Sequence, residues 1–138
     1  MKMTNTPANI FNTAFQAGLN WDDYLASSGD HADAWREARG RVCLSDSQKA
    51  LLQDFDRSMQ ILVVSGAWCG DCVRQGPVLA AFADACPLMH LRFIDRDDSS
   101  SPISMISIND GNRVPVVIFM AEDGALVSTY GDRTLSYY

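Results

Sequence analysis

Four consecutive apolar residues at positions 61–64, Ile-Leu-Val-Val, restrict the possible folds of this chain more than any other feature. A strand with one face in water alternates apolar and polar residues, whereas a short continuous run is typical of a strand covered on both faces. Two further apolar runs follow at 91–94 and 116–119. The chain therefore predicts an α/β fold, in which helices cover both faces of a small central sheet.

The first 57 residues are predicted to form a helical extension that packs on the sheet domain. Apolar residues recur at i, i+1, i+4 and i+5 from Ile10, which is one face of a helix that ends near Gly18. Three more helices are expected to begin after residues that commonly cap helices, namely Asn20, Asp30 and Ser45.

The remaining residues, 58–138, are predicted to form the sheet domain, with the order β-α-β-α-β-β. Its expected elements are strands at 61–64, 91–94, 116–119 and 125–130 and helices at 69–85 and 103–108. Asp123 and Gly124 form a turn, so the last two strands should make a hairpin. The crossover helix makes the first two strands parallel, and the central sheet is therefore mixed.

Composition argues against several classes of protein. Of the 138 residues, 47% are hydrophobic, so a single domain can bury a core without disulfides or a structural metal. The formal net charge of −6 repels phosphate groups, which argues against nucleic acid and anionic membranes as partners. No apolar stretch is long enough for a signal-peptide core or a membrane span, so we expect the protein in the cytoplasm.

Two of the four cysteines, Cys69 and Cys72, form a Cys-x-x-Cys motif where the first strand gives way to the next helix. Free N–H groups at a helix N-terminus stabilise a thiolate, so Cys69 is predicted to be an exposed, activated sulfur. Cys72 follows one turn later and is shielded. The pair suits two-step exchange, in which Cys69 attacks a substrate disulfide and Cys72 resolves the mixed disulfide.

A structural metal site is the alternative reading of this motif, because zinc uses the same spacing. Such a site usually needs four ligands, and the other candidates are scattered and form no second pair: Cys43, Cys86, His31 and His90. Structural disulfides are rare in the reducing cytosol, which also favours catalysis. We therefore expect neither a metal nor a bound cofactor.

Residues 68–72, Trp-Cys-Gly-Asp-Cys, resemble the active-site motif of thioredoxins, and further matches follow in order. Pro77 stands where thioredoxins carry the proline that bends the active-site helix. Val114 and Pro115, followed by an apolar strand, resemble the cis-proline segment of that family. The resemblance implies a thioredoxin-like sandwich.

The likeness to thioredoxins covers residues 58–135. Asp123 and Gly124 match the hairpin turn of the family, and Gly131 matches a glycine near the end of its last strand. The helical start of this chain is longer than the strand and helix that open a standard thioredoxin. Together with residues 131–133, Gly-Asp-Arg, it resembles a bacterial thioredoxin-like subfamily that has a helical N-terminal extension.

The same resemblance implies the residues of the site. The catalytic pair is Cys69 and Cys72, and the supporting residues are Trp68, Gly70, Asp71, Val114 and Pro115. Trp68 would form an apolar platform beside the sulfur, and the backbone of Val114 would pair with an extended substrate peptide. The implied partners are protein disulfides and an external reductant, either a thioredoxin-reductase-like protein or a low-molecular-weight thiol.

Two positions depart from the thioredoxin pattern. Most thioredoxins have a buried aspartate six residues before the first cysteine, where this chain has Val63, so Cys72 lacks its usual proton acceptor. Asp71 replaces the usual proline between the cysteines, and its charge opposes the stabilisation of a thiolate by the helix terminus. Because these effects nearly cancel, we expect a reducing rather than an oxidising protein.

The chain also ends where thioredoxins have a last helix, which covers one face of the sheet. Residues 134–138 would barely begin that helix, so the C-terminal helix is expected to be missing. A truncated product, a covering extension or a partner subunit would each account for this, and an uncovered apolar face drives association. We hypothesise a gene fragment with some tendency to form a weak homodimer.

Together these features predict a thiol–disulfide oxidoreductase that reduces protein disulfides. Two alternatives stay open, a redox-inactive binding or adaptor module on the same fold and a structural metal-binding protein. The intact cysteine pair and Pro115 favour the enzyme, because a module without redox chemistry needs neither.

Overall fold

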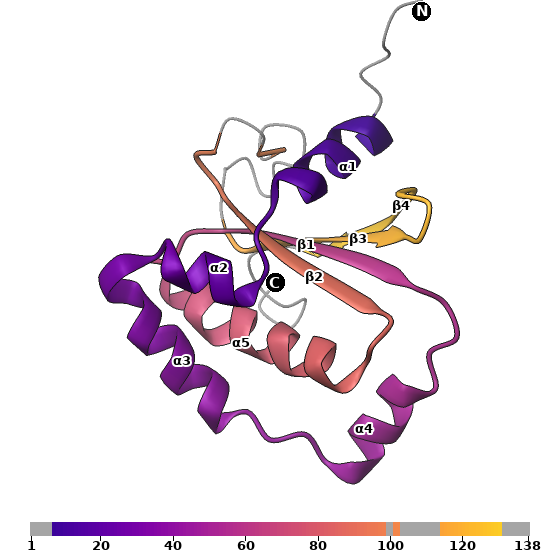
Figure 1. Ribbon diagram of the computed structural model, residues 1–138, viewed down its shortest axis with the longest axis horizontal. Coiled ribbons are helices and arrows are strands. Elements are labelled where there is room, and N and C mark those ends of the chain that lie inside the picture. Colours follow the sequence, from indigo (N-terminus) through magenta and orange to yellow (C-terminus); the bar gives the residue numbers. More distant parts are fainter. Residues whose placement is uncertain (1–6, 99–100, 103–113, 131–138) are drawn as a thin grey trace, which may run out of the picture.

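A computed structural model describes residues 7–98, 101–102 and 114–130 of the chain. Figure 1 shows the helices and strands within these ranges. The helices are α1 (Pro7–Ala17), α2 (Trp21–Ala26), α3 (Ala32–Arg41), α4 (Asp46–Gln53) and α5 (Gly70–Ala85), with a 3-10 turn, η1, at Gly29–His31. The strands are β1 (Met59–Ser65), β2 (Met89–Asp95), β3 (Val116–Ala121) and β4 (Leu126–Tyr130).

The strands form one mixed sheet in the order β2-β1-β3-β4. β1 runs parallel to β2, with Val63 opposite Phe93, because α5 carries the chain across between them. β3 runs antiparallel to β1 and places Val117 opposite Val63. β4 pairs with β3 in a hairpin, where Gly124 takes a positive φ of 86° in the turn. The predicted mixed sheet, with a parallel pair and a hairpin at one edge, is confirmed.

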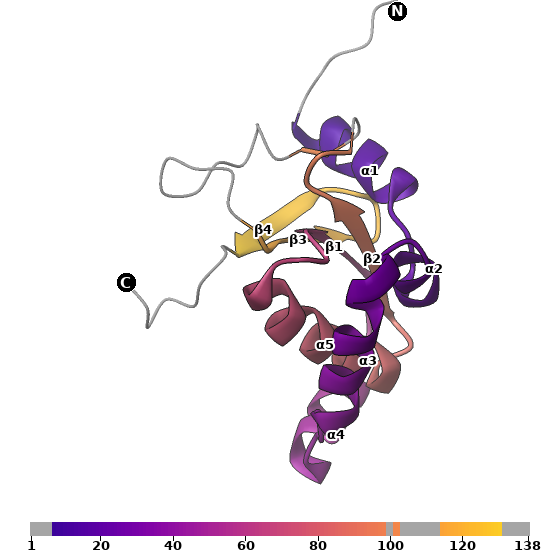
Figure 2. The same ribbon diagram turned by 90° about the vertical axis from the view of Figure 1, so that its left-hand side faces the viewer.

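Helices lie on both faces of the sheet, as Figures 1 and 2 show. α1 covers one face, where it contacts β1, β2 and β4, and α5 covers the opposite face. α3 packs against α5. β1 is therefore enclosed, and the side chains at 61–65 are at most 1% exposed. This is the α/β sandwich that the continuous apolar run predicts.

An aromatic cluster joins the N-terminal helices to the sheet. Trp21 and Tyr24 of α2 and Trp35 of α3 pack around Phe93 of β2, with ring centroids 5.1 to 6.0 Å apart. Tyr24 and Trp35 are 3% and 0% exposed. Burying aromatic side chains of this size contributes several kcal/mol, so these helices stabilise the sheet. The division of the chain at residue 57 stays a prediction.

The predicted helix caps are found at two of the three positions. The side chain of Asn20 accepts a hydrogen bond from the first turn of α2, and Ser45 forms a capping box at the start of α4. Asp30 does not cap α3, because it lies inside η1, and α3 begins after His31 without a side-chain cap. The 3-10 turn leads directly into α3, so the chain there needs no capping side chain.

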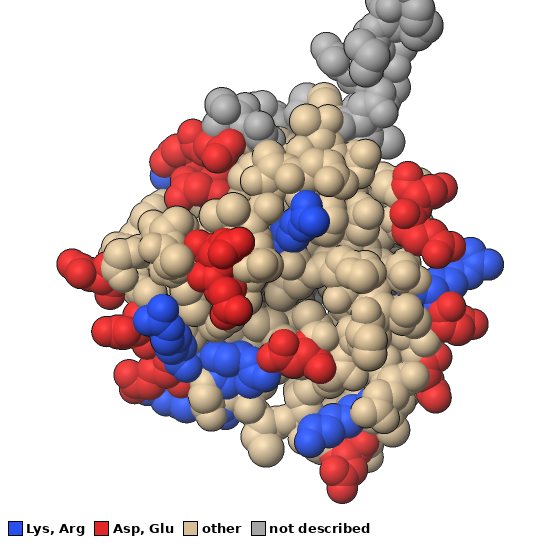
Figure 3. Space-filling view, viewed as in Figure 1, with Lys and Arg blue, Asp and Glu red and all other residues tan. Residues whose placement is uncertain are grey.

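The short helix expected at 103–108 and the incomplete helix expected at 134–138 lie outside the described residues. On the face shown in Figure 3, acidic and basic side chains are interspersed. Ion pairs join some of them on the described surface, such as Arg39 and Asp84, whose nitrogen and oxygen are 2.7 Å apart. None of the helices in the described ranges is both long and apolar enough to cross a membrane.

Candidate active site

Cys69 lies in the turn between the central strand and the helix that follows it. β1 ends at Ser65, and Cys69 is the N-cap residue of α5, with extended backbone angles of φ −83° and ψ 128°. Its N–H donates to the carbonyl of Gly66 at 2.9 Å and closes the turn. The half-buried sulfur thus lies at the start of a 16-residue helix, where free N–H groups and the helix dipole favour negative charge.

The sulfur of Cys69 faces the segment that precedes β3. Its thiol donates a hydrogen bond to the carbonyl oxygen of Val114, with a distance of 3.6 Å. The peptide bond between Val114 and Pro115 is cis, and both residues are buried. The fold therefore brings together two parts of the predicted site that lie 45 residues apart in the sequence.

Cys72 lies one turn into α5 and is completely buried. Burial raises the pKa of its thiol well above the ordinary value, because apolar surroundings disfavour the thiolate. A hydrogen bond from the backbone of Gly66 acts in the opposite direction, and the neighbouring Cys69 and Asp71 raise the pKa further. Both cysteines are free thiols. Cys72 is thus a protected, protonated thiol at neutral pH, whereas Cys69 is partly accessible.

Trp68 provides an exposed apolar surface beside Cys69, and the residue is 52% exposed to solvent. Its indole packs directly on the backbone of Gly66, where a Cβ would lie 2.5 Å from the ring. The guanidinium carbon of Arg96 lies 5.0 Å from the ring centroid, within the range of a cation–π contact. The missing side chain at Gly66 therefore allows the indole to lie close to the turn.

The two residues between the cysteines belong to the first turn of α5. Asp71 forms an ion pair with Arg74, which offsets part of the carboxylate charge beside the cysteines. Gly70 is exposed, and a Cβ there would approach only the side chain of Arg74, at 3.9 Å. No close packing requires a glycine at this position.

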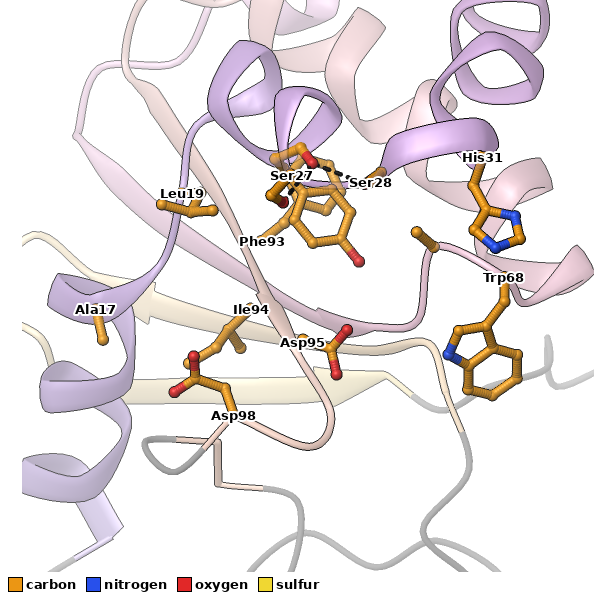
Figure 4. A pocket seen from close by; sticks show the side chains of 12 residues that line it. Ala17, Leu19, Ser27, Ser28, His31, Trp68, Phe93, Ile94, Asp95 and Asp98 are labelled. Carbon is orange, nitrogen blue, oxygen red and sulfur yellow. Dashed lines mark hydrogen bonds between the residues drawn. The ribbon is translucent and has the colours of Figure 1, made fainter.

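A cavity of about 380 Å³ opens beside Trp68, between the N-terminal helices and the C-terminal end of β2 (Figure 4). Trp68 and His31 lie at one end of it and Leu19 at the other, as Figure 4 shows. The lining is partly apolar and includes the carboxylates of Asp95 and Asp98. Through Trp68, the cavity adjoins the accessible side of the cysteine turn.

Three side chains that support this turn were not assigned to the site from the sequence. The hydroxyl groups of Ser65 and Tyr24, both buried, are hydrogen-bonded at 2.6 Å, and burial raises the pKa of Tyr24 to about 12. The indole N–H of Trp35 donates to the carbonyl of Ala67 at 3.0 Å. The one sequence signal is the hydroxyl of Ser65 directly after four apolar residues, because Tyr24 and Trp35 resemble ordinary core aromatics.

The fold and the site define a class of protein, namely α/β sandwiches in which a Cys-x-x-Cys pair starts a helix opposite a cis-proline. A family model described as Thioredoxin matches residues 18–136, and the chain belongs to the thioredoxin family. Within the described part of the chain, no group of three or more histidine, cysteine or acidic side chains is arranged to hold a metal ion.

Two solved structures share this fold. The crystal structure of an HIV epitope scaffold is 20% identical, with a TM-score of 0.74 and a match that covers 89% of this chain and 77% of that one. The crystal structure of a protein of unknown function from Pseudomonas aeruginosa is 19% identical, with a TM-score of 0.75 and coverage of 96% and 80%. At these identities the likeness concerns the fold alone. No curated protein matches the chain.

Proposed function

We propose that this protein is a thiol–disulfide oxidoreductase that reduces disulfides in other proteins through Cys69 and Cys72. One observation carries the proposal: the sulfur of Cys69 lies at the N-terminus of α5, 3.6 Å from the carbonyl before cis-Pro115, with Cys72 buried one turn behind it. Membership of the thioredoxin family is compatible with redox chemistry and supports this assignment.

In the first step, the thiolate of Cys69 attacks one sulfur of a substrate disulfide. A new S–S bond joins Cys69 to the substrate, the substrate disulfide breaks, and the second substrate sulfur leaves as a thiolate and takes a proton from solvent. The N–H groups at the start of α5 favour the attacking thiolate. The backbone of Val114 would pair with the extended substrate chain beside the reacting sulfur.

In the second step, Cys72 loses its proton to solvent and its sulfur attacks Cys69. The bond from Cys69 to the substrate breaks, a disulfide forms between the two cysteines, and the first substrate sulfur leaves as a thiolate and is protonated. The substrate has then gained two electrons and two protons. Because burial raises the pKa of Cys72, we expect this step to be the slower one at neutral pH.

An external donor must then return two electrons to the disulfide of the protein. We infer a thioredoxin-reductase-like protein or a low-molecular-weight thiol as this donor and the cytoplasm as the compartment, where such reductants keep thiols reduced. The substrates are proteins with accessible disulfides. The exposed indole of Trp68 and the cavity beside it support this choice, because they provide surface for side chains that flank a disulfide.

Reduction of insulin, with dithiothreitol as the electron donor, tests the function. The wild-type protein should accelerate precipitation of the freed insulin chain, and Cys69→Ser should abolish the acceleration because no mixed disulfide can form. Cys43→Ser is the matched control, because Cys43 is an exposed free cysteine outside the motif. The Cys43→Ser variant should reduce insulin at the same rate as the wild-type protein.

A wild-type rate no higher than that of Cys69→Ser would contradict this function and favour a redox-inactive adaptor. Elemental analysis of protein purified without chelator tests the metal-binding alternative. A stoichiometric metal ion that protects both motif cysteines from alkylation would contradict a working dithiol.

A further inference from the structure

Two side chains from the N-terminal helices hold the turn between β1 and α5. Tyr24 of α2 bonds its hydroxyl to that of Ser65 at 2.6 Å, in the buried core. Trp35 of α3 donates its indole N–H to the carbonyl of Ala67 at 3.0 Å. These two bonds hold the residues on either side of Gly66, whose backbone forms a hydrogen bond with the resolving sulfur.

Gly66 is also enclosed by its own turn. Its carbonyl accepts a hydrogen bond from the N–H of Cys69 at 2.9 Å, and the indole of Trp68 packs on its backbone. The carbonyl of Ser65 accepts from the N–H of Arg96 at 2.9 Å. The direction of the Gly66 N–H therefore depends on the residues beside it and on the side chains that hold them.

Cys72 has few neighbours that favour its thiolate. Val63 lies on the same face of β1 as Ser65, because side chains alternate along a strand, and it is buried and apolar. The titratable groups that face Cys72 are Cys69, Asp71 and Tyr24. Cys69 and Asp71 raise the pKa of Cys72, and the phenol of Tyr24 is neutral at working pH. The hydrogen bond from Gly66 lowers it, so ionisation of Cys72 depends on that contact.

We propose that Tyr24 and Trp35 are positioning residues for the resolving step. By holding the turn on either side of Gly66, they keep its N–H directed at the sulfur of Cys72. In that step the thiol proton goes to solvent, and the new S–S bond forms as the bond to the substrate breaks. The inference rests on the function proposed above, and it assigns the N-terminal helices a part in the chemistry.

The size of the expected effect follows from the chemistry of thiols. If the N–H of Gly66 no longer points at the sulfur, the pKa of Cys72 rises. Each unit of that rise lowers the thiolate fraction of Cys72 tenfold at neutral pH. The more basic thiolate is a better nucleophile, with a Brønsted coefficient of about 0.4–0.5, which recovers part of the loss. The net effect is about a three- to fourfold slower resolving step for each unit of pKa. Burial raises the pKa of Tyr24 to about 12, and the charges of Asp95 and the two cysteines add to the shift, so the phenol is neutral at working pH.

Reaction with equimolar dithiobis(nitrobenzoate) separates the two steps without a protein substrate. All proteins carry Cys43→Ser, which removes the exposed free thiol outside the motif, so attack by Cys69 releases the first thionitrobenzoate and attack by Cys72 on the mixed disulfide releases the second. Tyr24→Phe keeps the ring and removes the hydroxyl. The second release should slow by about threefold or more, and the first should be unchanged. Trp35→Phe, which removes the indole N–H, should act in the same direction.

A double-mutant cycle identifies the bond responsible. Ser65→Ala should slow the second release as much as Tyr24→Phe, and the double variant should be no slower than either, because all three lack the same bond. Trp21→Phe is the matched control, because Trp21 packs in the same aromatic cluster. It has no side-chain hydrogen bond to the turn among the described contacts, so neither release should change.

The contrary outcomes are distinct from one another. The inference is overturned if the second release is unchanged in Tyr24→Phe, or if both releases slow equally. It is also overturned if the effects add in the double variant, or if Trp21→Phe slows the second release to a similar extent. Each of these outcomes points to packing alone. A Cys43→Ser protein, otherwise unchanged, that releases a single thionitrobenzoate through Cys69 would instead overturn the dithiol function itself.

Discussion

Tyr24 links two parts of the molecule through one hydroxyl group. Its ring stacks on Phe93, with centroids 5.1 Å apart and an angle of 18° between the planes. Its hydroxyl bonds to Ser65 in a fully buried position, and burial raises its pKa from 10.0 to about 12. A buried hydroxyl without its partner costs about 1–3 kcal/mol, so this pair matters to stability as well as to the turn.

The raised pKa of Tyr24 predicts a loss of stability in alkali. Between about pH 10 and about pH 12, the unfolded chain loses the phenolic proton while the folded protein keeps it. Stability from this group is therefore complete below pH 10.0 and is lost as the pH rises toward 12, by about 1.4 kcal/mol per pH unit. Urea unfolding across this range measures the free energy of unfolding.

Tyr24→Phe is the control for this pH dependence. The variant starts less stable, because Ser65 loses its partner, but it lacks the titrating phenol. All other tyrosines and cysteines are common to both proteins, so their effects cancel in the difference. The two free energies of unfolding should converge as the pH rises. A constant difference would show that Tyr24 does not titrate differently in the folded state.

At the scale of elements, α5 contains a glycine for a reason of packing. Glycine normally weakens the middle of a helix by about 0.5–1 kcal/mol relative to alanine. Gly76 is buried against the ring of Trp35, so closely that a Cβ would overlap with it. Trp35 is 0% exposed and lies within the aromatic cluster. The close approach of α3 to α5 thus depends on the absence of a side chain at Gly76.

The same substitution in two helices should have opposite effects. Gly76→Ala is expected to lower the free energy of unfolding by about 1–3 kcal/mol, because the new methyl group overpacks the core beside Trp35. Gly40→Ala in α3 should raise it by about 0.5–1 kcal/mol, because nothing lies within 4 Å of the added Cβ and only helix propensity changes. Chemical denaturation measures both. A Gly76→Ala variant as stable as the wild type would contradict the packing argument.

At the scale of the whole molecule, the N-terminal helices and the sheet share one hydrophobic core. Phe11 and Phe15 of α1 belong to the same buried cluster as Ile61 and the residues that follow it in β1. An apolar groove on the other face of the sheet is lined by α5 and β3, with Phe82 and Phe119 among its residues. The weak homodimer expected from the sequence stays a prediction.

The shared core predicts that residues 58–138 do not fold by themselves. Without the N-terminal helices, Phe93 and the apolar side chains of β1 would face water on one side. A fragment of these residues should lack near-ultraviolet circular dichroism and should unfold without a cooperative transition. The full chain is the reference. A fragment with a sharp transition and a fixed tertiary signal would contradict the prediction.

Most of the fold and the central motif could be predicted from local patterns. Periodicity and capping depend on residues a few positions apart, so the sequence was enough to place β1, α5 and the capped starts of α2 and α4. Asp30 failed as a cap because η1 leads directly into α3, and the residue pattern does not distinguish a 3-10 turn from a capped helix start.

By itself, the sequence determined where the strands and the dithiol helix lie and that Cys69 stands at the start of that helix, because each follows from short-range geometry. The likeness to thioredoxins predicted that the cis-proline segment lies opposite the cysteines. Only the tertiary structure decided that the thiol of Cys69 bonds to the carbonyl of Val114, that Tyr24 bonds to Ser65 and that Trp35 lies against α5. Such contacts depend on how separate elements pack. Nothing in the neighbouring residues distinguishes a tyrosine that bonds to a buried hydroxyl from one that only fills a core.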